Sequence, residues 1–484
     1  MKFSTILVKS TVTVFLLALS GCGGNGPYSV NMMPSPEVYT TGVVNPFSDD
    51  NPVASVPWNG LLYVTNRLPS REGDNNQFYS EIPSSLLRLG VSYIKISGEN
   101  DIRWEELRQI SLLKNRKKEY PLVVDSIEEY GVLDRSYYRF MDPATVAAEP
   151  EKVGRKFAGN INDKLAISKQ KNIYIYVHGY NTNFEDPILV STELWHYLNY
   201  DGVFIAYSWP ATNKGTAYFG DTEKANWSGR HLRMLLQYLS DTTDAENIHI
   251  IGYSMGTRVT TQALHDLSMM YFGQSNDVVR QSLRLGNVIL ISGDLSTQLI
   301  GNYYLDGILD IVKSLSIYSS EKDSVLGASD WIFDHKRLGQ MTIEFMEQSP
   351  VIGEALVNED RLRLVDASRA VGVDAGKGHQ YFRSSPWVSS DVLMTLMYDL
   401  PPGTRGLVRN DGPVWGFPED YISRLQLSFQ QVEQDITIET SQPKLADRIR
   451  FLHKVLVRFV RKYTLKDLRP GFSYNTALFV NSSD

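Results

Sequence analysis

The stretch Asn247-Ile-His-Ile-Ile-Gly-Tyr-Ser-Met-Gly-Thr-Arg-Val-Thr260 decides which fold we expect for this chain. Its β-branched run, residues 248–251, predicts a short buried strand, and residues 257–270 predict a helix. Between them, Gly252-Tyr253-Ser254-Met255-Gly256 has the pattern G-x-S-x-G. A strand, a sharp turn and a helix in this order expose the serine at the tip of the strand, and the glycines let the two backbones approach closely. We therefore predict that Ser254 is a nucleophile.

Short apolar runs alternate with helical segments on both sides of this stretch. Strands that are apolar along their whole length are typical of a mostly parallel sheet covered by helices on both faces. The sequence therefore predicts an α/β fold. The expected strands are residues 60–66, 86–96, 121–124, 173–177, 203–207, 248–251, 287–292, 315–318 and 362–366, and the expected helices are residues 104–112, 185–198, 222–239 and 257–270.

A serine hydroxyl needs a base, and the base needs an orienting acid. In proteins with this kind of turn the chain order is serine, acid, histidine, so the base has to follow Ser254. His379 lies in Asp374-Ala-Gly-Lys-Gly-His-Gln-Tyr381, a glycine-rich loop after the last expected core strand, from which the ring can reach the strand ends. We predict His379 as the base. The other downstream histidines are His265, His335 and His453, which we expect on helices or in charged surface segments.

Two aspartates compete for the role of the acid. Asp323 follows the expected strand 315–318, two strands after the nucleophile, which is the usual position. Asp294 follows the strand before it and is the rival, with a possible alternative role in capping the next turn or bracing the histidine loop. Glu321 is a weaker candidate. We favour Asp323 and leave Asp294 open.

The negative charge of the transition state needs two backbone N–H groups. One is expected from Met255, directly after the nucleophile. The other is expected from Tyr180, in the turn after the strand 173–177. His178 precedes the serine and ends a strand, so we interpret it as structural. An aromatic group after the strand 203–207 either packs in the core or forms a substrate wall: Trp209, Tyr218, Phe219 and Trp227.

Several motifs, taken together, resemble a family of bacterial α/β-hydrolases of unknown function. The resemblance covers roughly residues 58–421 and implies an α/β-hydrolase fold with a serine-hydrolase site at Ser254, Asp323 and His379, but no substrate. One departure is Ile291-Ser-Gly-Asp294, where relatives tend to have an Ala-Pro-Asp ending. The motifs are Ile175-Tyr-Val-His-Gly-Tyr-Asn-Thr-Asn-Phe-Glu185, Tyr207-Ser-Trp-Pro210, Gly252-Tyr-Ser-Met-Gly-Thr257, Tyr318-Ser-Ser-Glu-Lys-Asp323, Gly378-His-Gln-Tyr-Phe382 and Trp415-Gly-Phe-Pro418.

The beginning of the chain looks like an export signal. Lys2 and Lys9 precede the apolar run 12–19, which leads into Leu19-Ser20-Gly21-Cys22 and is too short to span a bilayer. The four residues Leu19-Ser20-Gly21-Cys22 resemble the lipobox of bacterial lipoproteins, and this resemblance implies cleavage after residue 21 and a lipid on Cys22. Cys22 is the only cysteine, so no internal disulfide is expected. Gly23 in place of Asp favours the outer membrane, so we expect a lipid-anchored protein of the bacterial cell envelope, on the periplasmic face of that membrane.

Four segments follow from these patterns. Residues 1–21 are the signal peptide, 22–57 a linker rich in Pro, Ser, Asn and Gly, 58–425 the hydrolase domain and 426–484 a helical extension. Within the extension, residues 444–468 predict a helix whose basic face is either solvated or meets anionic lipid. Residues 340–356 are either a connecting helix or part of a lid or acyl pocket.

Composition excludes some classes of function. The net charge is −7, and removal of residues 1–21 with two lysines makes it −9, which argues against nucleic-acid binding. The histidines lack the spacing of a metal site, and no phosphate-binding glycine motif follows a strand, so no metal or cofactor is expected. Our first hypothesis is a lipid-anchored serine hydrolase that cleaves a small-molecule or lipid carboxylic ester. The alternatives are a thioesterase or amidase with the same residues, and a non-catalytic lipoprotein that binds a partner.

Overall fold

The computed structural model describes residues 27–72, 74, 76–97, 102–323, 354, 357–373, 379–410 and 414–439. The predicted signal peptide, Cys22, His335, His453, the predicted helix 444–468 and almost all of the segment 340–356 lie outside these residues.

The described strands form one sheet in the order β1-β4-β3-β2-β6-β5-β7-β8-β9-β10-β12-β11. The strands from β2 to β12 in this order run parallel to their neighbours. Nearly every residue in the middle of this parallel part is buried, as expected for strands covered on both faces. The predicted α/β-hydrolase architecture is therefore confirmed. The parallel strands are β2 (Leu61–Pro69), β6 (Val203–Ser208), β5 (Asn172–Val177), β7 (Asn247–Tyr253), β8 (Leu285–Ile291), β9 (Val312–Ser319), β10 (Leu362–Asp366) and β12 (Trp415–Gly416).

Antiparallel strands extend the sheet at both edges. On one side β2 pairs with β3 (Tyr79–Ile96), which pairs with β4 (Pro121–Val132), and β4 pairs with β1 (Ser29–Asn31). On the other side the short β11 (Val408–Arg409) pairs with β12. Strands β3 and β4 are longer than predicted. The added residues of β4, 125–132, are all exposed or partly exposed, and the added residues of β3, 79–85, include polar residues and a proline, so neither part forms an apolar run in the sequence.

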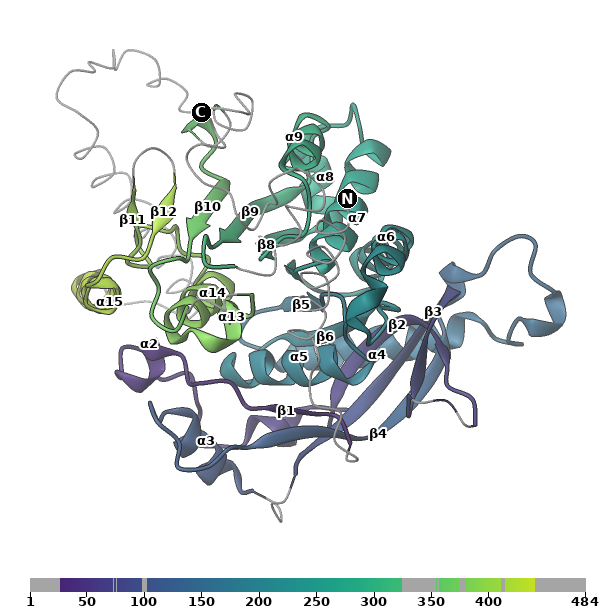
Figure 1. Ribbon diagram of the computed structural model, residues 1–484, viewed down its shortest axis with the longest axis horizontal. Helices are drawn as coiled ribbons and strands as arrows, with labels where there is room; N and C mark the ends of the chain where they lie inside the picture. The colour runs from purple at the N-terminus through teal and green to yellow at the C-terminus, as the bar shows by residue number, and fades with distance from the viewer. Residues whose placement is uncertain are drawn as a thin grey trace, which may run out of the picture.

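Helices cover both faces of the parallel strands. In Figure 1, α6, α7, α8 and α9 lie on one side of the central strands, and α5, α13 and α14 lie on the other. The sequence indicated α3, α5, α6 and α7. It did not indicate α4, although the buried residues of α4 follow helical spacing, and it did not indicate α8, α9, α13 or α14. The helices are α3 (Trp104–Ser111), α4 (Glu151–Ile167), α5 (Glu185–Tyr197), α6 (Tyr218–Thr242), α7 (Gly256–Met270), α8 (Asn276–Leu283), α9 (Thr297–Leu305), α13 (Tyr381–Ser384), α14 (Pro386–Tyr398) and α15 (Tyr421–Glu439).

The segment predicted as a linker is part of the fold over its described part, residues 27–57, so that prediction is wrong. Strand β1 pairs with β4 in the register Ser29↔Val123, and a short helix, α2 (Glu37–Thr40), packs against α14. Val38 and Phe47 are buried in the main core. The apolar residues of this segment are spaced irregularly between polar and proline residues, so no period revealed them.

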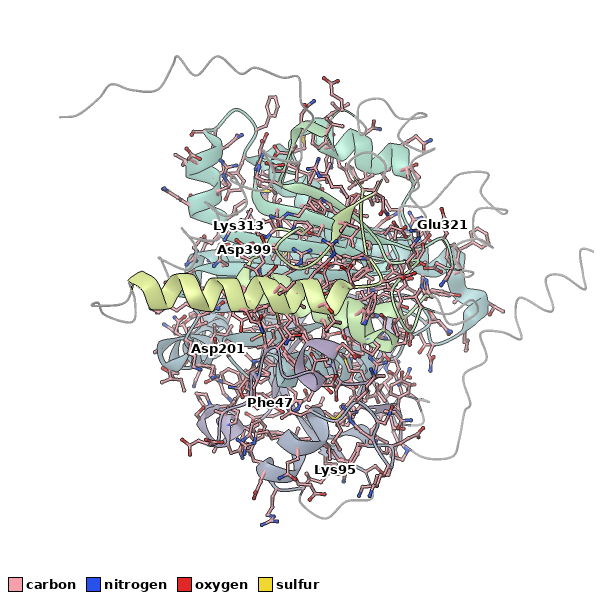
Figure 2. The ribbon with its side chains drawn as sticks, turned by 90° about the vertical axis from the view of Figure 1, so that its left-hand side faces the viewer. Phe47, Lys95, Asp201, Lys313, Glu321 and Asp399 are labelled. Atoms are coloured by element: carbon pink, nitrogen blue, oxygen red, sulfur yellow. The ribbon has the colours of Figure 1, made fainter. Side chains whose placement is uncertain are left out.

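The far end of the domain packs over the same region. Figure 2 shows α15 crossing this side of the molecule, with Phe47 on one side of it and Lys313 and Asp399 on the other. Lys313 at the start of β9 and Asp399 at the end of α14 form an ion pair of 2.6 Å. The N-terminal segment, the sheet and the last described helix therefore belong to one packed unit.

Candidate active site

The turn between β7 and α7 holds Ser254 in a strained backbone conformation. Its φ angle is +51°, in the left-handed region that residues other than glycine rarely adopt. The Ser254 N–H donates to the carbonyl of Ile291 at 2.9 Å, and the Ser254 carbonyl accepts from the Thr257 hydroxyl at 2.6 Å. A Cβ on Gly256 would lie 2.3 Å from the carbonyl oxygen of Val177. The glycine and the two anchoring hydrogen bonds explain why this sequence forms the sharp turn.

His379 faces Ser254 at the carboxyl ends of the parallel strands, in a loop that follows β10. Its Nε2 lies 2.8 Å from the Ser254 Oγ, and its Nδ1 lies 2.9 Å from the Asp323 Oδ2 and 3.0 Å from Oδ1. Asp323 is buried, and the His379 side chain keeps 15% of its surface exposed. The structure therefore brings together the three residues that the sequence singled out. With both ring nitrogens occupied, the imidazole can take a proton from the serine hydroxyl while the carboxylate stabilises the resulting cation.

The turn that carries His379 is fixed by the ends of β8 and β9. The Ser292 hydroxyl donates to the carbonyl of His379 at 2.8 Å. The Tyr381 hydroxyl donates to the carbonyl of Tyr318 at 2.8 Å and accepts from the Ser292 N–H. Buried tyrosines that use their hydroxyls in this way hold a loop in one position. The ring of His379 is thus aimed by contacts on its backbone as well as by Asp323.

Asp294 lies on the opposite side of the nucleophile turn. Its N–H donates to the Ser254 carbonyl at 3.3 Å, and its Oδ2 accepts from the Tyr218 hydroxyl at 2.7 Å and lies 3.5 Å from the Arg258 Nε. These contacts tie α6, α7 and the end of β8 to the turn. They do not fit the acid role, because the His379 ring nitrogens face Ser254 and Asp323. The predicted bracing of the histidine loop stays a prediction, since residues 374–378 lie outside the described part of the chain.

The other rival groups are placed elsewhere. Glu321 is exposed and near the edge of the molecule in Figure 2, and its N–H is bonded to the Ser368 hydroxyl. His265 lies on the side of α7, where its Nε2 is 2.9 Å from the Asp306 carboxylate and its ring stacks on Tyr303. His265 and Glu321 are therefore engaged away from Ser254.

The two predicted oxyanion amides belong to groups that flank Ser254. Met255 precedes the first residue of α7, where the helix dipole favours negative charge, and it is buried. Tyr180 follows Gly179, and a Cβ on Gly179 would lie 3.0 Å from the Ser254 Cβ. Within the described part of the chain, neither amide donates to a protein acceptor. Two N–H groups left available beside the serine are what an oxyanion hole requires.

His178 holds the loop that carries Tyr180, as the sequence indicated. Its ring is buried, stacks on Trp209 with 5.1 Å between centroids, and has its Nε2 3.1 Å from the Trp209 carbonyl oxygen. The Trp209 indole N–H donates back to the His178 carbonyl at 2.7 Å. Burial, together with the nearby Arg67 guanidinium, lowers the pKa of His178 to about 3. A histidine that stays neutral and fully bonded serves as scaffold.

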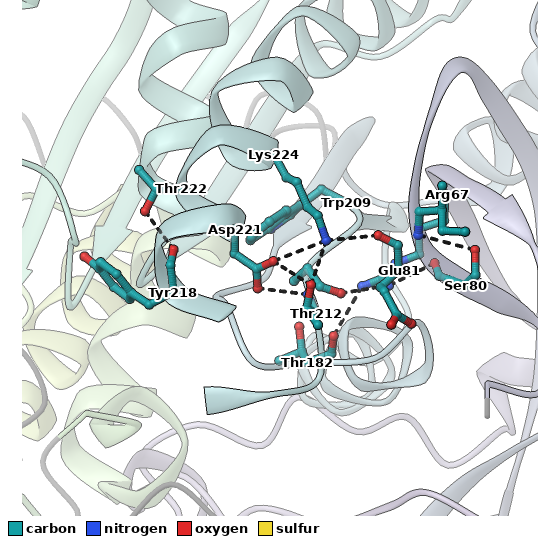
Figure 3. A network of polar contacts seen from close by, with 12 residues as sticks. Arg67, Ser80, Glu81, Thr182, Trp209, Thr212, Tyr218, Asp221, Thr222 and Lys224 are labelled. Carbon is teal, nitrogen blue, oxygen red and sulfur yellow. Dashed lines mark hydrogen bonds and ion pairs between the residues drawn. The ribbon is translucent and has the colours of Figure 1, made fainter. Parts of the chain in front are cut away.

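Arg67 supports the same loop and was missed by the sequence analysis. It is fully buried at the end of β2, and its guanidinium donates to the carbonyls of Thr182 and Ala211 and to the Ser208 hydroxyl (Figure 3). Burial lowers its pKa to about 10, so it stays charged at neutral pH. The signal was available, since an arginine directly after a run of buried strand residues needs a buried polar role.

A second polar network in Figure 3 anchors the start of α6. Asp221 accepts from both the N–H and the hydroxyl of Thr212 at 2.8 Å, and Lys224 lies 3.4 Å from the same carboxylate. Lys224 also donates to the carbonyl of Glu81 at 3.1 Å, on β3. Burial raises the pKa of Asp221, against the hydrogen bonds from Thr212. The network fixes the position of Tyr218, the partner of Asp294.

The predicted aromatic group separates in the structure. Trp209 is buried under His178, and Tyr218 is half-buried against Asp294. Phe219 and Trp227 are 63% and 57% exposed. The four residues therefore do not form one substrate wall.

A different set of residues surrounds the nucleophile. A cavity of about 160 Å³ opens beside Ser254 and His379. Its walls combine aromatic rings with two charged groups, Asp186 from α5 and Arg383 from α13. The aromatic side chains that line it are Tyr28, Tyr176, Tyr180, Tyr253 and Phe382.

Tyr28 and Arg383 were not identified from the sequence. Tyr28 lies in the segment that we interpreted as a linker, and Arg383 directly follows the motif Gly378-His-Gln-Tyr-Phe382 but belongs to no pattern of its own. Among the residues that the structure describes, no group of three His, Cys, Asp or Glu side chains is placed to hold a metal ion. In the same part of the chain, no helix is both long enough and apolar enough to cross a membrane.

The family model "Alpha/beta hydrolase of unknown function (DUF900)" matches residues 155–396, half of the chain. The chain belongs to this family. The matched region contains the Ser254 turn, Asp323, His379 and the two amides that we predicted for an oxyanion hole.

Comparison with other proteins adds little to this assignment. A lipase-esterase related protein from Clostridium acetobutylicum, known from its crystal structure, is 15% identical to this hydrolase, over 56% of this chain and 94% of that one, with a TM-score of 0.18. A TM-score of that size carries no argument about function. Comparison with curated proteins gives no match.

Proposed function

We propose that this α/β hydrolase cleaves a carboxylic ester through an acyl-enzyme on Ser254. The observation that carries the proposal is the continuous chain of hydrogen bonds from Asp323 through His379 to the Ser254 Oγ, with distances of 2.9 and 2.8 Å. A hydroxyl becomes a competent nucleophile only when a positioned base removes its proton. Structural serines at strand ends need no such partner.

The reaction follows from the positions of these groups. His379 takes the Ser254 proton as Oγ attacks the ester carbonyl, and the negative charge on the carbonyl oxygen is stabilised by the Met255 and Tyr180 amides. The C–O bond of the ester then breaks, and His379 gives the proton to the leaving alkoxide. Water attacks the acyl-enzyme with His379 again as base, and the acid is released. Asp323 stays ionised and orients the ring throughout.

The choice of an ester over an amide rests on the energy needed to make the carbonyl carbon tetrahedral. The amide bond is stabilised by resonance, which has to be lost when its carbon becomes tetrahedral. The same groups act on all three bonds, so the ranking is measured directly by offering matched acetyl esters, thioesters and anilides. We expect the ester and the thioester to be cleaved with a higher kcat/KM than the anilide.

The proposal includes an anchor in the cell envelope through a lipid on Cys22. Cys22 lies six residues before Tyr28, which lines the cavity beside Ser254. Six residues of extended chain reach at most about 21 Å. A lipid on Cys22 therefore keeps the cavity close to the membrane surface and favours an ester that resides in or at that membrane. Mass spectrometry of the N-terminal peptide tests the lipid, and Cys22→Ala should move the protein to the soluble fraction.

Steady-state hydrolysis of p-nitrophenyl acetate tests the enzymatic claim. Wild type and Ser268→Ala should hydrolyse it at similar rates. Ser268 is a buried serine of α7, the helix that follows the Ser254 turn, and its hydroxyl donates to the carbonyl of His265. Ser254→Ala and His379→Ala should reduce the rate at least a thousandfold, roughly the loss typical of such residues. Equal activity of wild type and Ser254→Ala would overturn the proposal.

A further inference from the structure

The segment around β1 forms an outer wall of the cavity beside Ser254. Tyr28 lines this cavity together with Ser254 and His379, although it precedes them by more than two hundred residues in the chain. Its hydroxyl donates to the Asp186 Oδ1 at 2.6 Å, and 37% of the residue stays exposed. A half-exposed ring that is fixed at its polar end lies at the boundary between cavity and solvent.

Contacts behind Tyr28 fix this wall. The backbone of Ser29 pairs with β4, and Val30 is buried. The Met33 N–H donates to the Glu193 Oε1 at 2.7 Å, and the Arg116 guanidinium donates to the carbonyl of Met33 at 2.8 Å and of Met32 at 3.1 Å. The segment is therefore held at several points along its length and does not hang loosely over the site.

The same wall is tied to the turn that carries His379. Arg383, four residues after His379, binds the buried Glu193 through Nε at 2.9 Å and Nη2 at 3.0 Å. Its Nη2 also donates to the carbonyl of Asn31 at 3.0 Å. A bidentate arginine–carboxylate pair fixes orientation as well as distance. The segment around β1 and the turn that carries His379 are thereby both fixed to α5 through the Glu193 carboxylate.

The size of the cavity limits the size of the substrate group that can lie beside this wall. Its volume of about 160 Å³ is well below the roughly 300–1,000 Å³ that is usual for ligand sites. A cavity of this size takes a short acyl group beside Ser254, and Tyr28 is one of the aromatic residues in its wall. Asp186 keeps the ring in place, and burial raises the pKa of the Asp186 carboxyl, against the hydrogen bond from Tyr28.

We propose that Tyr28, held by Asp186, is a specificity-determining residue that restricts the acyl group of the ester to a few carbons. The inference rests on the proposed ester hydrolysis at Ser254. It adds to that proposal the class of substrate, an ester of a short-chain acid, and the residue that excludes longer ones.

The test compares p-nitrophenyl acetate and p-nitrophenyl octanoate as substrates of the full chain. Wild type should prefer the acetate. Tyr28→Ala should raise the ratio of kcat/KM for octanoate over acetate by about tenfold or more, a factor that lies within the range for a pocket contact of this size. Tyr28→Phe keeps the ring and loses only the bond to Asp186, so its ratio should fall between the two. Tyr138→Ala, an exposed tyrosine on the β4–α4 connection, is the matched control and should keep the wild-type ratio.

Failure of this inference is distinct from failure of the proposed function. If wild type cleaves the acetate through Ser254 and Tyr28→Ala keeps the wild-type ratio, the inference is wrong and the hydrolase proposal stands. A wild type that prefers the octanoate also overturns the inference. If wild type cleaves neither ester and Ser254 does not react with a fluorophosphonate, both proposals fall. If the ratio of kcat/KM for octanoate over acetate rises in Tyr28→Ala and Asp186→Ala, but not in Tyr138→Ala, the result supports Tyr28 as the residue that excludes longer acyl groups.

Discussion

Two buried aspartates flank the Ser254 turn, and they have different partners. Asp323 accepts from the His379 ring, which in turn contacts the serine hydroxyl. Asp294 accepts from Tyr218 and lies beside Arg258, while its own N–H bonds the serine carbonyl. Asp323 therefore acts on the side chain of the nucleophile through its carboxylate, whereas Asp294 contacts the backbone of the nucleophile through its own N–H. Both follow parallel strands at the same edge of the sheet, so strand-end position alone does not assign a role.

The largest expected difference between the two aspartates is in activity. Asp323→Asn should lower kcat on p-nitrophenyl acetate by roughly 10³- to 10⁴-fold, because the His379 ring loses its orienting anion. Asp294→Asn should lower it less than about tenfold, since Asn keeps an oxygen for the Tyr218 hydroxyl. The comparison is made with both variants at one pH. A greater loss in Asp294→Asn would reverse the assignment of the acid.

The order of the two aspartate variants should be different for stability than for activity. Asp294→Asn removes the charge beside Arg258, whose side chain is only 13% exposed, and we expect the free energy of unfolding to fall by about 1.5–3 kcal/mol. Urea denaturation followed by fluorescence measures this quantity. Unchanged stability of Asp294→Asn would show that its contacts do not brace the turn.

The pH dependence of the free energy of unfolding tests whether His178 stays neutral in the folded protein. Because burial lowers the pKa of His178 to about 3 from the ordinary 6.5, the unfolded chain takes up the proton first as the pH falls. Its contribution to stability is complete above pH 6.5 and is lost towards pH 3. Relative to His178→Gln, wild type should lose about 2 kcal/mol of unfolding free energy between pH 7 and pH 5. Urea titrations of both proteins at these two pH values measure it, and parallel pH profiles would contradict a buried neutral His178.

The smallest effect concerns the hydrogen bond from Tyr218 to Asp294. Tyr218→Phe keeps the ring, which packs edge-on against Tyr180 at 5.4 Å, and removes only the hydroxyl. We expect a loss of about 0.5–1.5 kcal/mol in unfolding free energy and little change in kcat. A thousandfold loss of kcat in this variant would place Asp294 in the chemistry and break the contrast with Asp323.

The parallel strands and the nucleophile turn were predictable because their signals are local. Residues 362–366 match β10 to the residue, and the apolar Leu362, Leu364 and Val365 of this strand are buried. The G-x-S-x-G turn and the chain order of serine, acid and histidine selected Ser254 and His379 and favoured Asp323, while Asp294 was left open.

The role of Tyr28 and the different roles of the two aspartates depend on tertiary contacts, which produce no periodic pattern in the sequence. Tyr28 is significant only because β1 pairs with β4 and places it beside Asp186. Asp294 and Asp323 differ in role only through the partners that α6, α7 and the histidine turn supply. Arg67 is a partial exception, because a charged residue at the end of an apolar strand already indicates a buried function.

The most direct test of the account is reaction with a fluorophosphonate, followed by mapping of the modified peptide. Wild type should be modified on the peptide that carries Ser254, Asp323→Asn should react much more slowly than wild type, and Ser254→Ala should not react. The control Ser268→Ala should react like wild type. Modification of another residue, or equal modification of Ser254→Ala, would contradict the assignment of Ser254 as the nucleophile.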